Sequence, residues 1–207
     1  MTTNIEAFCT TCWKCQTSKT ETQKPQGLLH SVPIPDRLWQ SIGMDFMGPL
    51  PWSYDHDYLL VVINCLTSQV HLMPTMTWVT ARGVAWLFLK EIMQLHGVPK
   101  SIVSDHDTKF TSIFWCKLHQ LMGTKLLTST AFHPQTDGTT EQANCSISQI
   151  LRTVIQDNQK DWAIKCTMVK FVLNSNVSMT TGFAPFKLNH RYILIMLHCV
   201  LAQPHST

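Results

Sequence analysis

Three acidic residues stand where the surrounding sequence predicts regular structure, and they are the best candidates for chemistry in this chain. Asp45 lies inside an otherwise apolar stretch, Asp105 closely follows the short apolar run Ile102-Val103, and Glu141 opens a segment with helical periodicity. The chain places 59 residues between the first two acids and 35 between the last two. We predict that the three carboxylates form one metal site.

A metal site explains why an acid would occupy a buried strand. An unpaired carboxylate there costs several kcal/mol unless something compensates its charge. Hard ions such as Mg²⁺ take oxygen ligands and keep positions open for water and phosphates. Two such ions about 4 Å apart stabilise both the attacking and the leaving oxygen of a phosphoryl displacement. Taken singly, Asp45, Asp105 and Glu141 also fit a strand-end, a turn and a helix N-terminal residue.

The first half of the sequence predicts three strands and a helix. Strands are expected from Trp39 to Leu50, from Tyr58 to Ile63 and from Val70 to Met76, and their short links predict an antiparallel meander. Apolar residues then repeat at helical spacing from a cap at Thr80 until Gly97. This is the pattern of an amphipathic helix packed on a sheet.

The second half alternates strands and helices, and this order predicts an α/β fold. Its expected elements are a short strand at Ile102-Val103, a helix from Ile113 to Leu121 ended by Gly123, a strand from Lys125 to Phe132, a loop, and helices from Glu141 to about Asn158 and from Trp162 to about Leu173. We therefore expect a five-stranded mixed sheet flanked by helices, which lets the three acids meet at one edge.

Composition favours an ordinary globular chain. Its 207 residues are 44% hydrophobic and 14% charged, enough for one domain and a small appendage. The net charge of +3 permits a nucleic-acid partner without requiring one. The first residues do not have the pattern of a signal peptide, and the longest apolar run, Tyr192 to Ala202, is about half of what a membrane span needs. A soluble intracellular protein with reduced cysteines is expected.

The appendage, residues 1–35, carries Cys9, Cys12 and Cys15 in a CxxCxxC pattern before a polar stretch. Cys12 and Cys15 have the spacing of half a zinc site, and His30 is a single further candidate ligand. A redox pair is the alternative, but no βαβ pattern surrounds these cysteines.

Five stretches resemble the integrase catalytic core of gypsy-class long-terminal-repeat retrotransposons, relatives of the retroviral integrases. They are Trp39–Phe46, Gly97–Asp105, Phe110–Trp115, Thr130–Glu141 and Thr181–Phe186, in the family's order. Thr130–Glu141 is the most specific, because it closely follows the family's pattern before its catalytic Glu. The resemblance runs from about residue 9 to about residue 192.

The resemblance implies a ribonuclease H-like fold and a two-Asp-one-Glu site on Asp45, Asp105 and Glu141. It implies two Mg²⁺ or Mn²⁺ ions, and an activity of DNA 3′-end processing followed by strand transfer of element DNA into target DNA. It also implies a homodimer or higher oligomer, no membrane partner, and a nuclear location where DNA is the substrate, otherwise a cytoplasmic one.

Four further residues are candidates for contact with DNA. His133 and Gln135 lie in the loop before Glu141, where the alternative is that this loop only forms a turn. Asn144 is three residues after Glu141 on the same helical face, and the family places a polar residue facing DNA there. Lys109 is a candidate phosphate contact or, equally, a solvated surface lysine.

The chain also departs from the family pattern. Residues 1–35 resemble the end of a His-His-Cys-Cys zinc module, residues 36–192 the catalytic core, and residues 193–207 an unrelated tail. Asn64-Cys65, His106-Asp107 and Gln142 stand where the family usually has an Asp-Arg pair, Arg-Gly and Arg. The alternative function is therefore a catalytically idle, domesticated integrase-like domain that binds nucleic acid or protein.

Overall fold

The computed structural model of the chain contains two compact units, Met1–Ser31 and Val32–Thr207. It describes residues 8, 11, 34–105, 107–128, 138–155, 159–178 and 181–192, and of residues 128 and 138–142 it describes the backbone. The fold below is that of the second unit. The predicted domain limits at residues 35 and 192 stay predictions.

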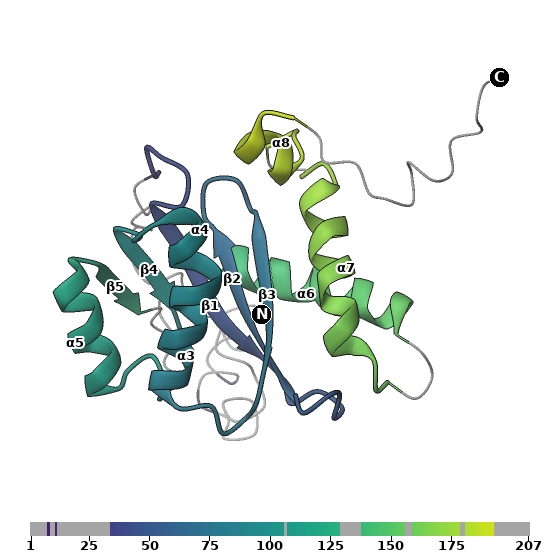
Figure 1. Cartoon of the computed structure of the whole chain (residues 1–207), viewed down its shortest axis with the longest axis horizontal. Coiled ribbons are helices and arrows are strands. Elements are labelled where there is room, and N and C mark those ends of the chain that lie inside the picture. Colours follow the sequence, from purple (N-terminus) through teal and green to yellow (C-terminus); the bar gives the residue numbers. More distant parts are fainter. Residues whose placement is uncertain are drawn as a thin grey trace. The chain divides into compact units, whose positions relative to one another are not determined.

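Five strands form one mixed sheet in the order β3-β2-β1-β4-β5 (Figure 1). Their bounds are β1 Ser41–Met47, β2 Tyr58–Asn64, β3 Val70–Thr75, β4 Ser101–Ser104 and β5 Lys125–Thr128. The first three strands are antiparallel neighbours, while β4 and β5 continue the sheet parallel to β1. The expected fold class and meander are confirmed, and the predicted end of the fifth strand at Phe132 lies outside the described residues.

The helices follow the predicted order with two differences. They are α3 Ala81–Phe88, the π-helical turn η1 Leu89–Met93, α4 Gln94–His96, α5 Ile113–Met122, α6 Gly138–Val154, α7 Trp162–Ser175 and α8 Pro185–His190. The helix expected from Glu141 to about Asn158 begins three residues earlier and ends at Val154. The short α8 was not predicted. None of the described helices is long and apolar enough to cross a bilayer.

Each face of the sheet carries its own core, because neighbouring strand residues point to opposite faces. Leu60 and Val62 of β2 pack in the first core, which includes side chains of α3 and α5. Leu59 and Val61 pack in the second core, with side chains of α6 and α7. Strand β2 is thus buried on both faces, as its continuous apolar run predicts.

Helix α5 lies within one residue of the predicted limits, and only some of its large side chains are buried. The Ser112 hydroxyl caps it by accepting from the Trp115 N–H, and Gly123 ends it in the left-handed region at φ 69°. Its buried residues are Trp115 and His119, whereas Leu121 is 87% exposed. The apolar residues of this helix therefore do not all mark its core face.

The buried His71 of the edge strand β3 contacts the half-buried His96 of α4. The Nε2 atoms of His71 and His96 lie 3.0 Å apart in a hydrogen bond, and the Trp39 ring stacks on His96 with centroids 3.7 Å apart. Burial, followed by the charge of its partner, lowers the pKa of His71 to about 3, and burial lowers that of His96 to about 4. Both rings therefore favour the neutral form in the folded chain.

Candidate active site

Asp45 and Asp105 are neighbours across two parallel strands. Met44 of β1 pairs with Ser104 of β4 at the last position of their register. Asp45 is the next residue of β1, and Asp105 directly follows the end of β4. Neighbouring strands lie about 4.8 Å apart, so the backbones of the two acids are close. Met44 points into the first core. By alternation, Asp45 points to the opposite face, which α6 covers.

Helix α6 contacts this face at Asp45. The Asn144 amide donates a 2.6 Å hydrogen bond from Nδ2 to Oδ2 of the Asp45 carboxylate. Glu141 lies in the first turn of the same helix, three residues before Asn144 and about 4.5 Å from it along the axis. The structure thus brings Asp45, Asp105 and Asn144 together and places the backbone of Glu141 one turn away. The Glu141 side chain lies outside the described set.

The Asn144 contact is the feature that sequence reasoning missed. A hydrogen bond to a carboxylate is short and strong, and this one fixes one oxygen of Asp45. The other oxygen, Oδ1, accepts from the Phe46 backbone N–H at 2.8 Å. Asn144 was predicted to face DNA, and its helical position after Glu141 gave no signal of a partner on β1. The buried Oδ1 of Asn144 has no partner among the described residues.

Hydrogen bonds in the turn after β4 give Asp105 and Asp107 different roles. Oδ1 of Asp105 accepts from the Asp107 backbone N–H at 3.1 Å. The Asp107 carboxylate in turn accepts from the Lys109 backbone N–H at 2.8 Å, and its other oxygen lies 3.5 Å from Lys109 Nζ. Asp107 therefore shapes the turn, which leaves Asp105 as the acid beside Asp45.

Lys109 is held by the protein. Its ammonium lies 4.7 Å from the centre of the Phe46 ring and 5.8 Å from that of Tyr58, in addition to the Asp107 contact. Its side chain is 16% exposed. A solvated surface lysine does not fit this surrounding, and contact of Lys109 with DNA stays a prediction.

The remaining predicted site residues lie outside the described residues. They are His133 and Gln135 in the loop before α6, and Cys12 and Cys15 in the first unit. Within the described side chains, no group of three or more His, Cys, Asp or Glu has the spacing of a metal site. That set leaves out the Glu141 carboxylate, so the three-acid site is untested.

The donor atoms that the structure brings together fit a hard divalent ion. Asp45 and Asp105 supply carboxylate oxygens, and the partnerless amide oxygen of Asn144 lies at the same place. Mg²⁺ and Mn²⁺ prefer such oxygen ligands, whereas softer metals select thiolates and imidazoles. The residues present therefore fit magnesium or manganese.

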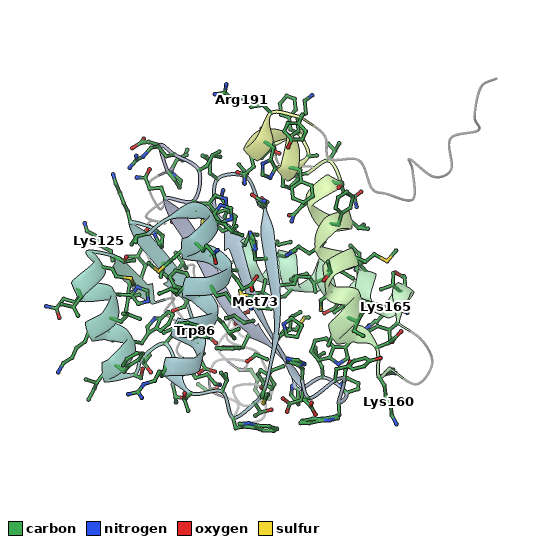
Figure 2. All side chains as sticks on the ribbon, in the orientation of Figure 1. Met73, Trp86, Lys125, Lys160, Lys165 and Arg191 are labelled. Carbon is green, nitrogen blue, oxygen red and sulfur yellow. The ribbon has the colours of Figure 1, made fainter. Side chains whose placement is uncertain are left out.

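Among the described residues, Lys109 is the basic side chain with recorded contacts next to this site. Figure 2 shows the labelled Lys125, Lys160 and Arg191 at well-separated places, on β5, before α7 and after α8. The neighbouring acids are therefore the feature that distinguishes the site.

Known proteins similar to this chain were found by sequence and by structure. No family model matches the sequence. The Transposon Tf2-3 and Tf2-4 polyproteins of Schizosaccharomyces pombe are each 31% identical over 188 residues, which is 91% of this chain and 14% of the relative. The chain thus spans about a seventh of the length of these relatives.

Solved structures with this fold come from retroviral integrases. The simian T-cell lymphotropic virus intasome in complex with a PP2A regulatory subunit matches at a TM-score of 0.64 and 17% identity, over 100% of this chain and 72% of that one. The HTLV-2 integrase catalytic core domain in complex with magnesium matches at a TM-score of 0.59 and 18% identity, over 73% of this chain and 97% of that one. The BIV integrase catalytic core domain matches at a TM-score of 0.58 and 18% identity, over 74% of this chain and 95% of that one.

The two comparisons establish different things. At these low identities the solved structures establish the fold, while the polyproteins establish the sequence relationship. The resemblance seen in the sequence is thereby confirmed: the chain is a homologue of Tf2 retrotransposon polyproteins and has the ribonuclease H-like fold of retroviral integrase catalytic cores.

Proposed function

We propose that this chain is an integrase catalytic core that performs DNA 3′-end processing and strand transfer through Asp45, Asp105 and Glu141. The observation that carries the proposal is the adjacency of Asp45 and Asp105 on the face where Asn144 holds Asp45. The backbone of Glu141 lies in the first turn of α6, about one turn before Asn144. Two acids from neighbouring strands and one from a covering helix make a set that can hold phosphate-bound cations.

The chain's own residues position the reacting groups. Asp45 is fixed by a buried strand and by the Asn144 amide, and Asp105 by its bond from the Asp107 N–H. When bound, Mg²⁺ or Mn²⁺ would neutralise phosphate charge and activate the attacking water or DNA 3′-hydroxyl. The displacement proceeds in line at phosphorus and needs no covalent bond between protein and DNA. The rigid placement of the carboxylates supplies the positioning part of catalysis.

Partners and location follow from this activity as further parts of the proposal. The partners are DNA, both element ends and target, and further copies of the chain in a dimer or higher oligomer. The matched structures include an intasome and a trimeric integrase core in complex with magnesium, and these assemblies support the proposed oligomer and divalent ions. A chain that acts on chromosomal DNA works in the nucleus.

The test measures metal binding and DNA joining together. Mg²⁺ and Mn²⁺ are titrated into the purified chain by calorimetry, and joining is followed on a branched DNA substrate in the disintegration reaction. We expect wild type to bind metal and join DNA, and Asp105→Asn to lose both. Asp55→Asn is the matched control, because Asp55 is exposed on the β1–β2 connection.

The outcomes separate activity from an idle fold. Joining that persists in Asp55→Asn and disappears in Asp105→Asn supports the proposed site. A well-folded wild-type chain that neither binds metal nor joins DNA overturns the proposal, and would leave the catalytically idle domain as the interpretation.

A further inference from the structure

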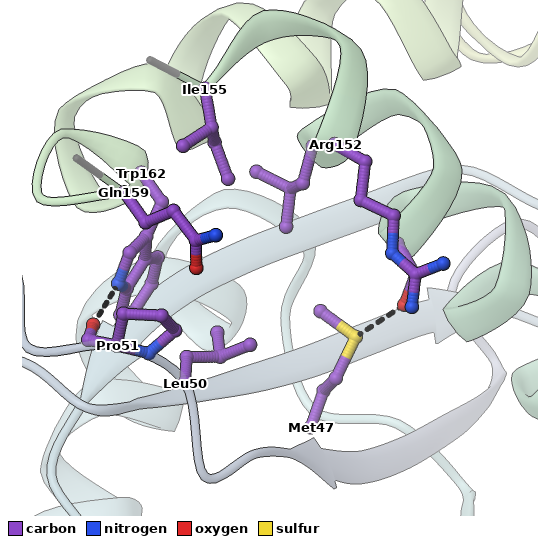
Figure 3. Close-up of a pocket in the computed structure, with 9 residues that line it drawn as sticks. Met47, Leu50, Pro51, Arg152, Ile155, Gln159 and Trp162 are labelled. Carbon is purple, nitrogen blue, oxygen red and sulfur yellow. Dashed lines mark hydrogen bonds between the residues drawn. The ribbon is translucent and has the colours of Figure 1, made fainter. Parts of the chain in front are cut away.

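A cavity of about 480 Å³ lies between the end of β1, helix α6 and the start of α7 (Figure 3). Its walls include Met47, Pro51, Ser148, Arg152, Gln159 and Trp162. Its volume falls in the range of small-ligand sites, roughly 300–1,000 Å³. The reaction proposed above gives this cavity no role.

Apolar side chains line most of the cavity, and its polar side chains are Ser148, Arg152 and Gln159. Figure 3 shows Arg152 and Gln159 on opposite sides, with Leu50 and Pro51 below them. The Trp162 indole N–H already donates to the Pro51 carbonyl at 2.5 Å. The Ser148 hydroxyl donates to Met47 Sδ at 3.3 Å. The polar groups left to face a ligand are therefore the guanidinium of Arg152 and the amide of Gln159.

The charge at the cavity favours an anion. Arg152 is exposed and takes part in none of the three ion pairs recorded for the described residues. Asp161, beside the cavity in sequence, is paired with Lys165 at 2.6 Å. Lys165 thus neutralises Asp161, and the Arg152 guanidinium is left to attract an anion. Arg binds phosphate well because two of its N–H groups donate in parallel to two phosphate oxygens.

The cavity continues the face of α6 that carries the active site. Asn144, Ser148 and Arg152 are spaced four residues apart and so lie on one side of the helix. Ser148 is about 6 Å and Arg152 about 12 Å beyond Asn144 along the axis. At roughly 3.4 Å per stacked nucleotide, these distances correspond to two to four nucleotides from the acids.

We propose that this cavity accepts an unpaired nucleobase of the DNA strand held at Asp45 and Asp105, while Arg152 contacts a phosphate of that strand. The inference rests on the proposed function, because the strand must pass the acids. The apolar walls bury the flat base, and the Gln159 amide faces its hydrogen-bonding edge. The base lies two to four nucleotides from the reactive phosphate, and the cavity thereby favours a frayed over a fully paired DNA end.

Photo-crosslinking tests the position directly. A branched DNA carries one 5-iodouracil at the first, second, third, fourth or a distant nucleotide from the reactive phosphate, and Ca²⁺ replaces the catalytic ion. We expect crosslinks to peptides that contain Met47–Trp52 or Gln159–Trp162 from the second to the fourth nucleotide. Crosslinks to other elements from those positions, or none, overturn the proposal.

Two exposed positions allow variants with little risk to folding. Arg152→Ala removes the phosphate contact, and Gln159→Gly removes the amide at a position whose φ of 54° glycine adopts without strain. We expect each to weaken binding of the frayed DNA roughly five- to tenfold, and Arg152→Ala to lower the salt-dependence slope by about 0.7, the value for one single-strand phosphate. Arg82→Ala on α3 is the control, since Arg82 is exposed and outside the cavity. Equal losses in all three variants would contradict a specific pocket.

The readouts separate this inference from the proposed activity. Crosslinking to the cavity without DNA joining in wild type would support the pocket and overturn the activity. DNA joining in wild type without crosslinks at the cavity would support the activity and overturn the pocket. Asp105→Asn provides the check within one experiment, because it should lose joining and keep the crosslinks.

Discussion

Removing the Asn144 amide tests whether its contact with Asp45 orients the carboxylate for metal binding. In Asn144→Ala the 2.6 Å hydrogen bond to the carboxylate is lost. Hydrogen bonds to charged groups contribute about 1.5–3 kcal/mol, and Asp45 is partly exposed, so water replaces part of this. We expect a loss of about 1 kcal/mol in unfolding free energy, or about 2–4 °C in Tm for a domain of this size.

The effect on metal binding should be larger than the effect on stability. A residue that orients a metal-binding carboxylate typically changes affinity or activity about 10- to 100-fold. We therefore expect Asn144→Ala to weaken Mn²⁺ binding in calorimetry and to slow DNA joining by that factor, while circular dichroism at room temperature stays unchanged. The stability loss is read from thermal melts of the same samples.

Gln149→Ala is the matched control for this experiment. Gln149 is exposed on the same helix, so its truncation changes α6 without touching Asp45. It should keep the metal affinity, the joining rate and the Tm of wild type. Wild-type Mn²⁺ affinity and joining in Asn144→Ala would refute the reasoning, because the bond would then not orient the carboxylate.

Three further changes test the packing. The buried Asn174 amide bonds both the N–H and the C=O of Val70, at 2.8 and 2.9 Å, so Asn174→Leu should lower the unfolding free energy in urea by about 2–4 kcal/mol. His119 is fully buried with both ring nitrogens partnerless among the described residues, so His119→Phe should raise stability by about 1 kcal/mol in urea. Because the pKa values of His71 and His96 are lowered from 6.5 to about 3 and about 4, stability should be full above pH 6.5 and fall as the pH drops toward 4, measured by urea titration at each pH.

Each of these changes has its own check. Asn176→Leu, at an exposed position just after α7, should stay within about 0.5 kcal/mol of wild type. His119→Phe should also lessen the acid sensitivity, because burial lowers the pKa of His119 to about 4. Lys170 and His190 carry the other charges that act on the histidine pair, and both oppose its protonation. Stability that does not change between pH 7 and pH 4 would contradict the linkage.

Elements with a strong local pattern could be predicted, and weak or short ones could not. The continuous apolar run of β2 and the capped helix from Thr80 to Gly97 match the structure closely. The start of α6 was misplaced because Gly138 and the two threonines after it have the composition of a loop, and tertiary packing decides such cases. The six-residue α8 is too short for its periodicity to be read.

The buried face of α5 shows the limit of pattern alone. Ile113 and Leu121 are the apolar residues that suggest a core face, yet they are 76% and 87% exposed. Trp115 and His119 are buried instead, in contact with the Phe88 ring of α3. The rotation of a helix on the sheet depends on which side chains fit the neighbouring helix, and the sequence of one helix does not contain that information.

The sequence by itself determined the kinds of residues at the candidate site and the local structure around them, because apolar periodicity, caps and turns act over a few residues. It placed Asp45 in a strand, Asp105 at the end of another and Glu141 at a helix start. Only the tertiary structure decided that β1 and β4 are neighbours, and that an amide 99 residues away holds Asp45. Strand order and contacts over such separations arise from the packing of the whole domain, which local patterns do not encode.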